Sequence, residues 1–552
     1  MYTLEDDKPQ IPTPFSQCGT LLRIHKDSAS PECLDRAVQW LSDCRANHSN
    51  CNRPPQVLPT RLLDISYDHG DLLIKIVEPN GLKGEYMALS HCWGQSKGLR
   101  STTHNIDRLK NTGFPWSSMP KTFRDAVVVC RYLGISYLWI DSLCILQDNK
   151  KDWEVESSKM CDIYGNAELV LAASLASDDN EGFLNSRGTP TLGPFPSKLC
   201  GNKENIYVTE TPPDIEDPLH KRGWCFQERL VSRRYLSFGT DELTWECNVD
   251  SLCECSGHNA SINQLDTYRT LFATRDLDHQ QIYECWNKII ISPYSTRNLT
   301  FNTDTLPALS GIAKYFMQHL QDEYLAGLWR QNLIVALLWT TCDKRAATKI
   351  SSYLAPSWSW ASVNTPVSTS HIHNQYSLPL ATLVDAKCVP LGADPTGQIA
   401  SGYIIIKGRL APVLLPLQLH LEDTVVVLHD SQGGELKCVL DLDGAIIPEV
   451  VPAMVPGRTI TTGRRVNSPD DDHVRVYYMM KIRTVQVWCL LLATLASDSV
   501  AGGFEGYGLI LAPCDASSEK YCRIGMFRSG TVSEEGSKYL FDDCEETKVI
   551  II

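Results

Sequence analysis

A predicted helix over residues 152–167 carries an acidic side chain on its apolar side. The segment reads DWEVESSKMCDIYGNA, and its large apolar residues recur on one stripe at helical spacing: Trp153, Met160, Ile163 and Tyr164. Glu156 falls near the middle of that stripe. A carboxylate on the core side is costly unless it is paired or lines a cleft. From the residues alone, the favoured interpretation of Glu156 is a structural salt bridge or a hydrogen-bonded cap, because structural pairs also turn acids inward, and the alternative is an acid that lines a cleft.

Three predicted strands, over 86–90, 135–141 and 168–174, each end in polar residues. If the three strands are parallel, their carboxyl ends meet at one edge of a sheet, which is where open α/β sheets bind ligands. We therefore predict a site for a small polar ligand at this edge. The residues that the edge would gather are Ser90, His91, Trp93, Asp141, Ser142 and Ser174. Glu156 would reach the same edge from the helix between two of the strands. For His91 alone, packing at the strand end is the favoured interpretation.

The segment 222–238, RGWCFQERLVSRRYLSF, supplies two further binding candidates, Arg222 and Glu228. It predicts a helix followed by a strand over 235–238. Arg222 or Arg234 is expected to pair with one of the inward acids, for which the candidates are Asp141, Glu156 and Glu228. Such a pair belongs either to a structural ion network or to an anion-binding wall, and the sequence does not separate the two.

Two cysteine tracts have residue types that bind metals. Cys44, His48 and Cys51 follow a C-x3-H-x2-C spacing, and Cys33 is the candidate for a fourth zinc ligand. The second tract holds Cys247, Cys253, Cys255 and His258, a spacing that is not a common zinc frame. The flanks of the first tract read as a helix end, so a packed helix cap is the favoured interpretation. We therefore expect no metal at either tract.

The elements that would position these residues alternate between helix and strand. Residues 119–133 predict a helix that begins near Pro120, where a missing N–H costs nothing, and ends before Gly134. Residues 135–140 are β-branched, aromatic and almost continuously apolar. That composition is typical of a strand buried on both faces, as in a parallel sheet. The predicted fold class is therefore α/β with a parallel sheet core.

The chain divides by composition into four predicted segments. Residues 1–80 form an N-terminal extension with a helix around 34–44 and a hairpin whose strands lie at 59–65 and 72–77. Residues 81–240 form the α/β core, and residues 241–355 are mainly helical. Residues 356–552 consist of strand-like runs divided by Gly, Pro and Asp turns, so we expect a β-rich C-terminal domain, either a sandwich or a barrel.

Composition excludes several classes of function. The 552 residues carry a net charge of −14, which argues against a general nucleic-acid binder or a binder of anionic membranes. The longest apolar run, around 487–496, is too short to span a bilayer. The 21 cysteines are scattered, and many lie in apolar segments, which is typical of reduced thiols in a cytoplasmic protein. No dinucleotide-binding glycine motif, P-loop or H-E-x-x-H motif occurs.

Four runs of sequence follow one another in a specific order. They are YMALSHCWG at 86–94, MPKTFRDAVVVCRYLGISYLWIDSLCILQD at 119–148, DWEVESSKMCDIYGNAELVLAAS at 152–174 and RGWCFQERLVSRRYLSF at 222–238. Together they resemble the heterokaryon-incompatibility (HET) domain proteins of fungi. TLPALSGIA at 305–313 and APSWSWAS at 355–362 look like later segments of the same family.

This resemblance implies a cytosolic protein of filamentous fungi that recognises non-self when unlike cells fuse and then triggers programmed cell death. HET domains are in turn remotely similar to TIR domains, which implies a TIR- or flavodoxin-like parallel sheet. ALSHCWG looks like the first TIR strand and its loop. DWEVE looks like the TIR helix that carries a catalytic glutamate, with the spacing from Trp153 to Glu156 one residue shorter than in that family.

TIR enzymes cleave the nicotinamide–ribose bond of NAD, so the resemblance implies NAD as a substrate and no further cofactor. A carboxylate in a dry cleft stabilises the oxocarbenium-like state of such a cleavage. Glu156 would be that acid, and Trp93 would stack on a flat ring. One alternative is a non-enzymatic module that signals by assembly as a homo-oligomer, or by binding a protein partner or its product. Another is a HET-like accessory protein recruited to specialised metabolism.

Overall fold

The computed structural model of the chain describes residues 3–4, 20–21, 24–66, 73–94, 98–187, 191–197, 204–209, 217–255, 278–342, 353–370, 380–416, 426–429, 435–443, 460–468, 471–482, 484–496, 504–514, 519–529 and 540–552. The chain forms two compact units. The first comprises Met1–Leu277 with Arg297–Leu299, and the second comprises Asp278–Thr296 with Thr300–Ile552. Each unit has a hydrophobic core of its own.

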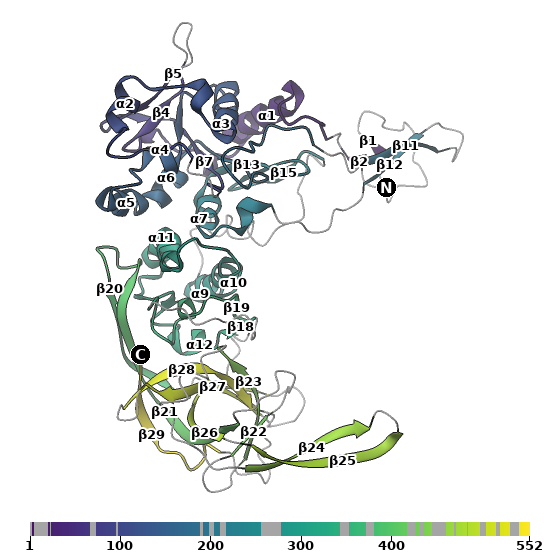
Figure 1. Cartoon of the computed structure of the whole chain (residues 1–552), viewed down its shortest axis with the longest axis vertical. Helices are drawn as coiled ribbons and strands as arrows, with labels where there is room; N and C mark the ends of the chain where they lie inside the picture. Colours follow the sequence, from purple (N-terminus) through teal and green to yellow (C-terminus); the bar gives the residue numbers. More distant parts are fainter. Residues whose placement is uncertain are drawn as a thin grey trace. The chain divides into compact units, whose positions relative to one another are not determined.

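A mixed sheet of nine described strands forms the centre of the first unit (Figure 1). In spatial order the strands are β15 (Ser251–Cys253), β14 (Leu243–Cys247), β13 (Arg234–Phe238), β10 (Leu169–Ala172), β7 (Met87–Ser90), β9 (Tyr137–Trp139), β4 (Leu62–Asp64), β5 (Leu73–Val77) and β8 (Phe114–Pro115). The four strands β13, β10, β7 and β9 are parallel to one another. The predicted parallel arrangement of the strands near 86–90, 135–141 and 168–174 is therefore confirmed. The remaining pairs of this sheet are antiparallel.

Helices cover both faces of this sheet, which explains why its parallel strands are buried and mostly apolar. Alternate strand residues pack in a core with α1 (Pro31–Asn47) and α3 (Lys121–Tyr132): Met87, Leu89, Leu138, Ile140, Leu169 and Leu171. The residues between them pack on the other face with α6 (Met160–Asn166) and α7 (Gly223–Val231): Tyr86, Ala88, Trp139, Val170 and Ala172. In Figure 1, α1 lies above β13 and β15, and α7 lies below β7 and β13.

Helix α1 begins after a capping residue, and helix α3 lies between a proline and a glycine that the sequence marks as its boundaries. The Ser30 hydroxyl accepts a hydrogen bond from the Cys33 amide, so Ser30 caps α1. Helix α3 follows Pro120 and ends before Gly134, whose φ is +75°. A left-handed residue after a helix favours glycine because it lacks a Cβ. Both helices lie where the sequence predicts them.

The predicted single helix over 152–167 is two helices. Helix α5 spans Lys150–Ser157, and α6 begins at Met160. Ser157 and Ser158 lie at the break, and their hydroxyls donate to the backbone carbonyls of Glu154 and Val155. Serine side chains that bond nearby backbone compete with helix continuation, so one helical wheel does not describe the whole segment. A one-turn helix, α4 (Asp141–Cys144), also begins directly after β9.

The predicted hairpin is formed by β4 and β5, which belong to the same sheet as the parallel strands. Its turn lies outside the described residues. The shorter elements of the unit are α2 (Ile106–Asn111), η2 (Ser49–Cys51), η3 (Trp116–Ser118), η5 (Pro218–Lys221), and the paired strands β1 (Thr3–Leu4) with β2 (Thr20–Leu21), β3 (Gln56–Val57) with β6 (Lys83–Gly84), and β11 (Thr191–Ser197) with β12 (Glu204–Thr209). The division of the chain into four segments stays a prediction.

The second unit begins with short helices around an aromatic core. They are α9 (His279–Glu284), the π-helix η6 (Cys285–Ile291), α10 (Ser292–Ser295), η7 (Asn302–Asp304), η8 (Pro307–Leu309), α11 (Ser310–Leu320), α12 (Leu333–Ala336) and η9 (Trp360–Ser362). Trp286 lies at the centre, with its ring within 6 Å of those of Phe316, Tyr324 and Trp329. Two small strand pairs accompany them: β16 (Tyr324–Leu325) with β17 (Leu328–Trp329), and β18 (Thr340–Thr341) with β19 (Val367–Ser368).

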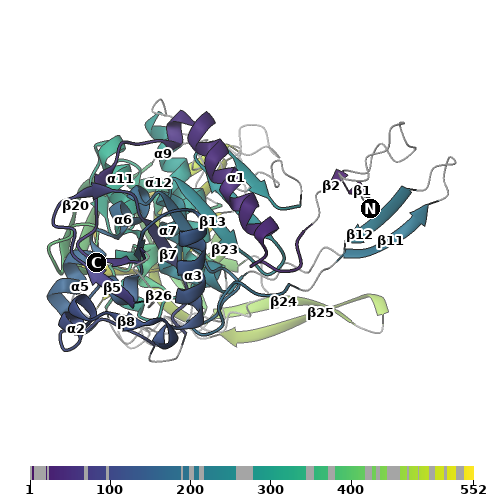
Figure 2. The ribbon, with the colours of Figure 1, turned by 90° about the horizontal axis from the view of Figure 1, so that it is seen from above.

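The rest of the second unit is β-rich, as predicted. Its main sheet contains β20 (Thr382–Pro390), β21 (Ile399–Pro416), β22 (Val426–His429), β23 (Glu435–Leu442), β26 (Thr484–Ala496), β27 (Phe504–Pro513), β28 (Lys520–Ser529) and β29 (Glu546–Ile551). Pairings run from β21 through β22, β23, β28, β27 and β26 back to β21, so the sheet closes on itself. Strands β24 (Ile460–Ser468) and β25 (Asp471–Ile482) form a separate two-stranded ribbon, drawn in light green in Figures 1 and 2.

One buried arginine, Arg523, joins the sheet of the second unit to its helical part. The Arg523 guanidinium on β28 donates to both carboxylate oxygens of Asp443, at 2.8 and 3.2 Å. It also donates to the carbonyls of Leu337 and Trp339. This bidentate pairing satisfies a charge that would otherwise be costly to bury.

Among the described residues, no helix is both long enough and apolar enough to cross a membrane. The described cysteines are free thiols, and most of them are buried. This agrees with the expectation of reduced thiols rather than a disulfide framework.

Candidate functional site

Polar and charged side chains gather at the carboxyl edge of the parallel strands. We call six of them the edge cluster: Ser90, His91, Asp141, Asp179, Arg222 and Glu228. Ser90 ends β7, and Asp141 follows β9 by two residues. Strand order runs β9-β7-β10-β13, so the chain leads from β7 to β9 on one side and from β10 to β13 on the other, and the order reverses between β7 and β10. Open α/β sheets bind ligands at the carboxyl ends of strands where the order reverses in this way.

Helix α7 supplies Glu228 to the cluster, and Arg222, the residue before this helix, supplies a positive charge. The Ser90 hydroxyl donates a hydrogen bond to the Glu228 carboxylate, and both residues are buried. Burial raises the pKa of Glu228, and the charge of Arg222 and the hydrogen bond from Ser90 only partly offset that rise. Arg222 precedes the first residue of α7 and donates to the carbonyl of His91. Burial would lower the pKa of Arg222, but nearby Cys225, Glu228 and Asp141 raise it, so its guanidinium stays charged.

His91 is buried between two acids and an aromatic ring. Its Nε2 lies 3.2 Å from Asp179 Oδ1 and 3.8 Å from Asp141 Oδ1. Its ring meets the Phe123 ring edge-on, with centroids 5.1 Å apart. Burial by itself would lower the pKa of His91, but Asp141 and Asp179 outweigh it and raise the pKa. His91 therefore packs at the strand end and lies beside two carboxylates that favour its charged form.

Asp141 links the two strand ends of the cluster. Its Oδ2 accepts a hydrogen bond from Trp93 Nε1 at 2.8 Å, and its Oδ1 accepts one from the Ser142 amide at 2.6 Å. The Arg100 guanidinium lies 5.0 Å from the centroid of the Trp93 ring. The Asp141 side chain is 13% exposed, and Trp93 is half-buried. Asp141 and its partner Trp93 are therefore partly exposed, as is Arg222, whereas the other members of the cluster are buried.

Three polar atoms at this edge are buried but have no hydrogen-bond partner among the described residues. They are Nε2 of His91, Oδ1 of Asp179 and Oγ of Ser142. The His91–Asp179 approach is thus an ion-pair distance without hydrogen-bond alignment. His91 Nε2 and Asp179 Oδ1 nevertheless face each other at 3.2 Å as an ion pair, whereas Ser142 Oγ has no hydrogen-bond partner among the described residues. Binding of a polar ligand at this strand edge stays a prediction.

Gly94 lets two loops of the site approach each other. Its φ is +69°, and a Cβ at this position would clash with Cβ of Asp178. The loop 176–182 can therefore pass close to the loop after β7 and bring Asp179 to His91. Only glycine combines this backbone conformation with that contact.

Glu156 lies in a different set of contacts. Its Oε1 accepts hydrogen bonds from Thr60 Oγ1 at 2.8 Å and from Lys159 Nζ at 2.9 Å, and its side chain is 3% exposed. Next to it, Arg61 pairs with Asp152. Among the described residues, the polar partners of Glu156 are these and not members of the edge cluster. Such contacts match the structural interpretation favoured for this acid, and its catalytic role stays a prediction.

Arg222 lies within the electrostatic influence of Glu228 and Asp141, but its described hydrogen bond goes to the carbonyl of His91, so its pairing with an inward acid stays a prediction. Arg234 does not pair with Asp141, Glu156 or Glu228; its Nη1 donates to Glu168 Oε1 at 2.9 Å. Strand β13 turns Arg234 toward α1, because its pleat alternates the residues of this segment between the two faces of the sheet. Ser174 also lies outside the cluster and shares a hydrogen bond with Ser237 at 2.6 Å.

Sequence reasoning missed Asp179 and Arg100. Asp179 lies in the polar loop that follows β10, and a search of every loop after a parallel strand would have included it. Arg100 comes shortly after residues 95–97, which lie outside the described part of the chain. No motif or spacing in the sequence predicts that its guanidinium lies over the Trp93 ring.

Sulfur-rich side chains form two groups elsewhere in the first unit. One contains Cys44, His48, Cys51 and Cys247, and the other contains Glu242, Cys253 and Cys255. Cys33, the expected fourth zinc ligand, lies outside the first group and accepts a hydrogen bond from Arg187 Nη2 at 3.7 Å. Cys247, which the sequence grouped with Cys253 and Cys255, lies beside Cys44, His48 and Cys51 in the structure. His258 lies outside the described residues. These groups are the side chains best suited to hold a metal ion.

The comparisons with known proteins point to one family. Residues 86–228 match the family model described as "Heterokaryon incompatibility protein (HET)". The match covers well under half of the chain and contains all six residues of the edge cluster, from Ser90 to Glu228. No curated protein and no solved structure matches the chain.

Proposed function

Because residues 86–228 form a HET domain, we propose that the protein acts in heterokaryon incompatibility as an effector that triggers regulated cell death on non-self recognition. Its working site is the edge cluster. The observation that supports this assignment is the convergence of buried polar and charged side chains at the carboxyl edge of the parallel strands, where His91 lies beside Asp141 and Asp179 and Ser90 bonds Glu228. A protein partner in the cytoplasm supplies the non-self signal.

The chemistry proposed for the site is cleavage of the nicotinamide–ribose bond of NAD. Breaking that bond develops positive charge on the ribose, which nearby carboxylates stabilise. Asp141 and Glu228 place two carboxylates at this edge, and Arg222 and His91 add groups that bind phosphate or hydroxyl oxygens. Trp93, half-buried and beside Asp141, offers a face for a flat ring. Glu156, the acid that the TIR resemblance singles out, is tested in parallel.

A second candidate function is a non-enzymatic module that signals by assembly or by binding a partner's product. The contacts of Glu156 favour it, because Lys159 and Thr60 already occupy one oxygen of its carboxylate. A carboxylate held in an ion pair is less available to a reacting ribose. In this function the β-rich second unit is the recognition surface. A recruited accessory role in specialised metabolism is the third possibility to be tested.

The experiment measures NAD content and growth in cells induced to express the full chain. Four proteins are compared: the wild type, Glu228→Gln, Glu156→Gln and Glu154→Gln. Glu154 is the matched control because it lies on the same helix as Glu156 and its side chain is 56% exposed. Thermal unfolding of each purified variant shows whether it folds.

We expect the wild type and Glu154→Gln to deplete NAD and stop growth, and folded Glu228→Gln to do neither. If Glu156→Gln is the harmless variant instead, the catalytic acid is Glu156, and the edge cluster is not the working site. Growth arrest at constant NAD would overturn the enzymatic proposal and support signalling by assembly. Unimpaired growth with the wild type would overturn the cell-death function and leave the accessory role.

A further inference from the structure

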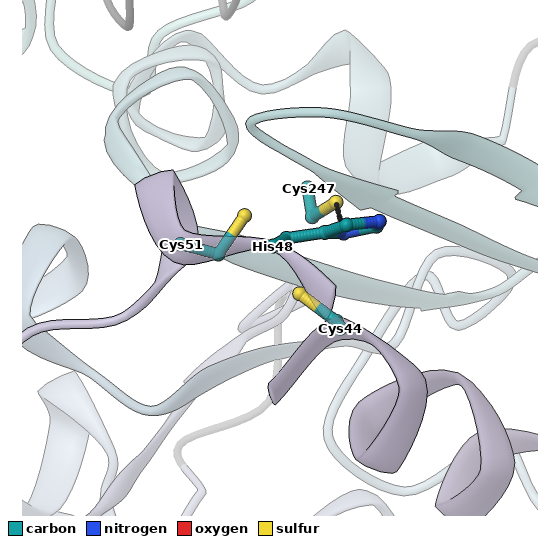
Figure 3. A group of neighbouring side chains, drawn as sticks. All are labelled: Cys44, His48, Cys51 and Cys247. Atoms are coloured by element: carbon teal, nitrogen blue, oxygen red, sulfur yellow. Dashed lines mark hydrogen bonds between the residues drawn. The ribbon is translucent and has the colours of Figure 1, made fainter. Parts of the chain in front are cut away.

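Three cysteine sulfurs and one imidazole converge at the end of α1 (Figure 3). Cys44 lies in the last turn of α1, His48 caps that helix, and Cys51 ends η2. Cys247, the last residue of β14, completes the group from 199 residues beyond His48. Figure 3 shows the four side chains pointing toward one another from these separate elements. Their ligand atoms all lie within 4.8 Å of one another.

We propose that Cys44, His48, Cys51 and Cys247 form a structural zinc site. Tetrahedral zinc with sulfur at about 2.3 Å and nitrogen at about 2.0–2.1 Å separates neighbouring ligand atoms by roughly 3.6–3.8 Å. The ligand atoms lie near this spacing: all of them are within 4.8 Å of one another, and His48 Nδ1 lies 3.4 Å from Cys247 Sγ, slightly closer than in a metal-bound tetrahedron. Thiolate and imidazole ligands in a tetrahedron are the set that zinc prefers among common divalent ions.

The second nitrogen of His48 has the partner that a metal-binding histidine needs. Its Nε2 lies 3.1 Å from Asp250 Oδ2. A carboxylate in this position holds the proton on Nε2, so that Nδ1 presents its lone pair to the other three residues. Asp250 comes from the turn after β14, the same turn that follows Cys247. One turn of chain therefore supplies both a ligand and the partner of another ligand.

Each sulfur also has a donor that stabilises a thiolate. The Val249 and Asp250 amides donate to Cys247 Sγ at 3.5 and 3.2 Å. Arg234 Nε donates to Cys44 Sγ at 3.2 Å, and the Asn248 amide donates to the sulfur of Cys51. Three thiolates, a neutral imidazole and Zn²⁺ leave one negative charge, which the buried Arg234 guanidinium offsets. Zinc binding releases the thiol protons to solvent, so charge and protons balance.

The burial of the group favours a structural role over a catalytic one. The three cysteines are buried, and the His48 side chain is only 17% exposed. Four protein ligands leave no open position for water or substrate, which is typical of structural zinc. The site would join the end of α1 to an antiparallel strand of the sheet, and so hold the N-terminal helix against the HET domain. The proposal does not depend on the proposed function.

The second sulfur group makes a useful contrast. Cys253 Sγ lies 2.9 Å from Cys255 Sγ, and Cys255 Sγ lies 3.4 Å from Glu242 Oε1. Among the described residues this group offers three ligands and no histidine. We propose no metal there, and the experiment treats it separately.

The test begins with the wild-type full chain, purified in reducing buffer without a chelator. Metal analysis is expected to find one zinc per chain, and zinc X-ray absorption to find three sulfurs and one nitrogen. Two variants then separate the fourth ligand seen here from the one suggested by sequence spacing. Cys247→Ala should lose one zinc, whereas Cys33→Ala, which also removes a buried thiol, should keep it.

The wild-type spectrum decides the proposal even if Cys247→Ala fails to fold. A wild type with no stoichiometric zinc that also takes up no Co²⁺ after reduction would overturn it. So would a zinc spectrum without sulfur neighbours, or loss of zinc from Cys33→Ala alone. If the wild type holds a second zinc, the same measurements on Cys255→Ala isolate the site at Cys247.

Discussion

The hydroxyl of Ser90, the last residue of β7, donates a hydrogen bond to the carboxylate of Glu228, 138 residues further along the chain on α7. Both side chains are buried. The bond joins a strand end to the helix that covers it, and it lowers the pKa of Glu228 against the rise caused by burial. Removing either partner therefore leaves a polar group in a place that water does not reach.

Removing this hydrogen bond is expected to destabilise the first unit. Ser90→Ala should lower the free energy of unfolding by about 1.5–3 kcal/mol, the range for a hydrogen bond to a charged group. Combined with Glu228→Gln in a double-mutant cycle, it should show a coupling of roughly 0.5–3 kcal/mol, since the residues are in contact. Urea unfolding followed by circular dichroism measures both quantities. Additive effects of the two substitutions would contradict a direct bond.

The charge on His91 should appear in the pH dependence of stability. Its folded pKa is raised above 6.5 by Asp141 and Asp179, which outweigh burial. The folded chain then binds the proton more tightly than the unfolded chain does. The resulting stability is fully present below pH 6.5 and is lost as the pH rises through the folded pKa. The steepest loss that one proton allows is about 1.4 kcal/mol per pH unit.

His91→Gln removes the titrating group, so its unfolding free energy should fall less steeply than that of the wild type as the pH rises from 6.5. Chemical unfolding at a series of pH values measures both slopes. The groups that face His91, which are Asp141, Asp179 and Arg222, remain in place in the variant. Parallel curves for the two proteins would show that His91 has the same pKa in the folded and unfolded chains.

Glu168 should matter far more for stability than its neighbour Glu85, although both pair with Arg45. Glu168 also pairs with Arg234, whose side chain is 1% exposed, at 2.9 Å. Glu168→Gln leaves a buried guanidinium without its carboxylate and should cost about 3–5 kcal/mol. Glu85→Gln breaks a pair in which the Glu85 side chain is 55% exposed, and should cost about 0–1 kcal/mol.

The same denaturant titration measures both Glu variants, because each variant removes one of the two carboxylates that pair with Arg45. Equal losses of stability would mean that Arg234 finds other partners in the folded chain. Its hydrogen bond to Asn52 Oδ1, at 2.6 Å, is the first to examine in that case.

Asp250→Asn should weaken zinc binding without abolishing it. Asp250 contacts His48 Nε2 and would act through that ligand, and removing such a partner typically costs 10–100-fold in metal affinity. Competition with a chromophoric chelator measures the affinity. Asp107→Asn, on the exposed side of α2, is the matched control and should bind zinc like the wild type. Unchanged affinity in Asp250→Asn would assign no positioning role to this carboxylate.

Much of the α/β core was predictable because its signals are local. The apolar stripe of α3, Pro120 before it and Gly134 after it all act within a few residues, and the structure confirms that helix. The continuous apolar run at β9 predicted a strand buried on both faces, and the helix-covered sheet confirms it. From these strands, the meeting of Ser90, His91 and Asp141 at one edge followed directly.

Pairings between distant residues could not be predicted in the same way. One helical wheel placed Glu156 correctly on the buried side, but the break after Ser157 and the choice of Thr60 and Lys159 as its partners arise from packing. Asp179 reaches His91 only because Gly94 lets two loops pass closely. Such contacts depend on how whole helices, strands and loops pack against one another in three dimensions.

Periodicity, capping and motif order act along the chain, so the local elements, the buried strands and the HET resemblance could be recognised without the fold. Tertiary structure alone decided which of two arginines serves the edge cluster, and that Cys247 rather than Cys33 lies beside Cys44, His48 and Cys51. The physical reason is that side-chain partners are set by three-dimensional distance. The pleat of β13 and the position of β14 set that distance, and spacing along the chain does not encode it.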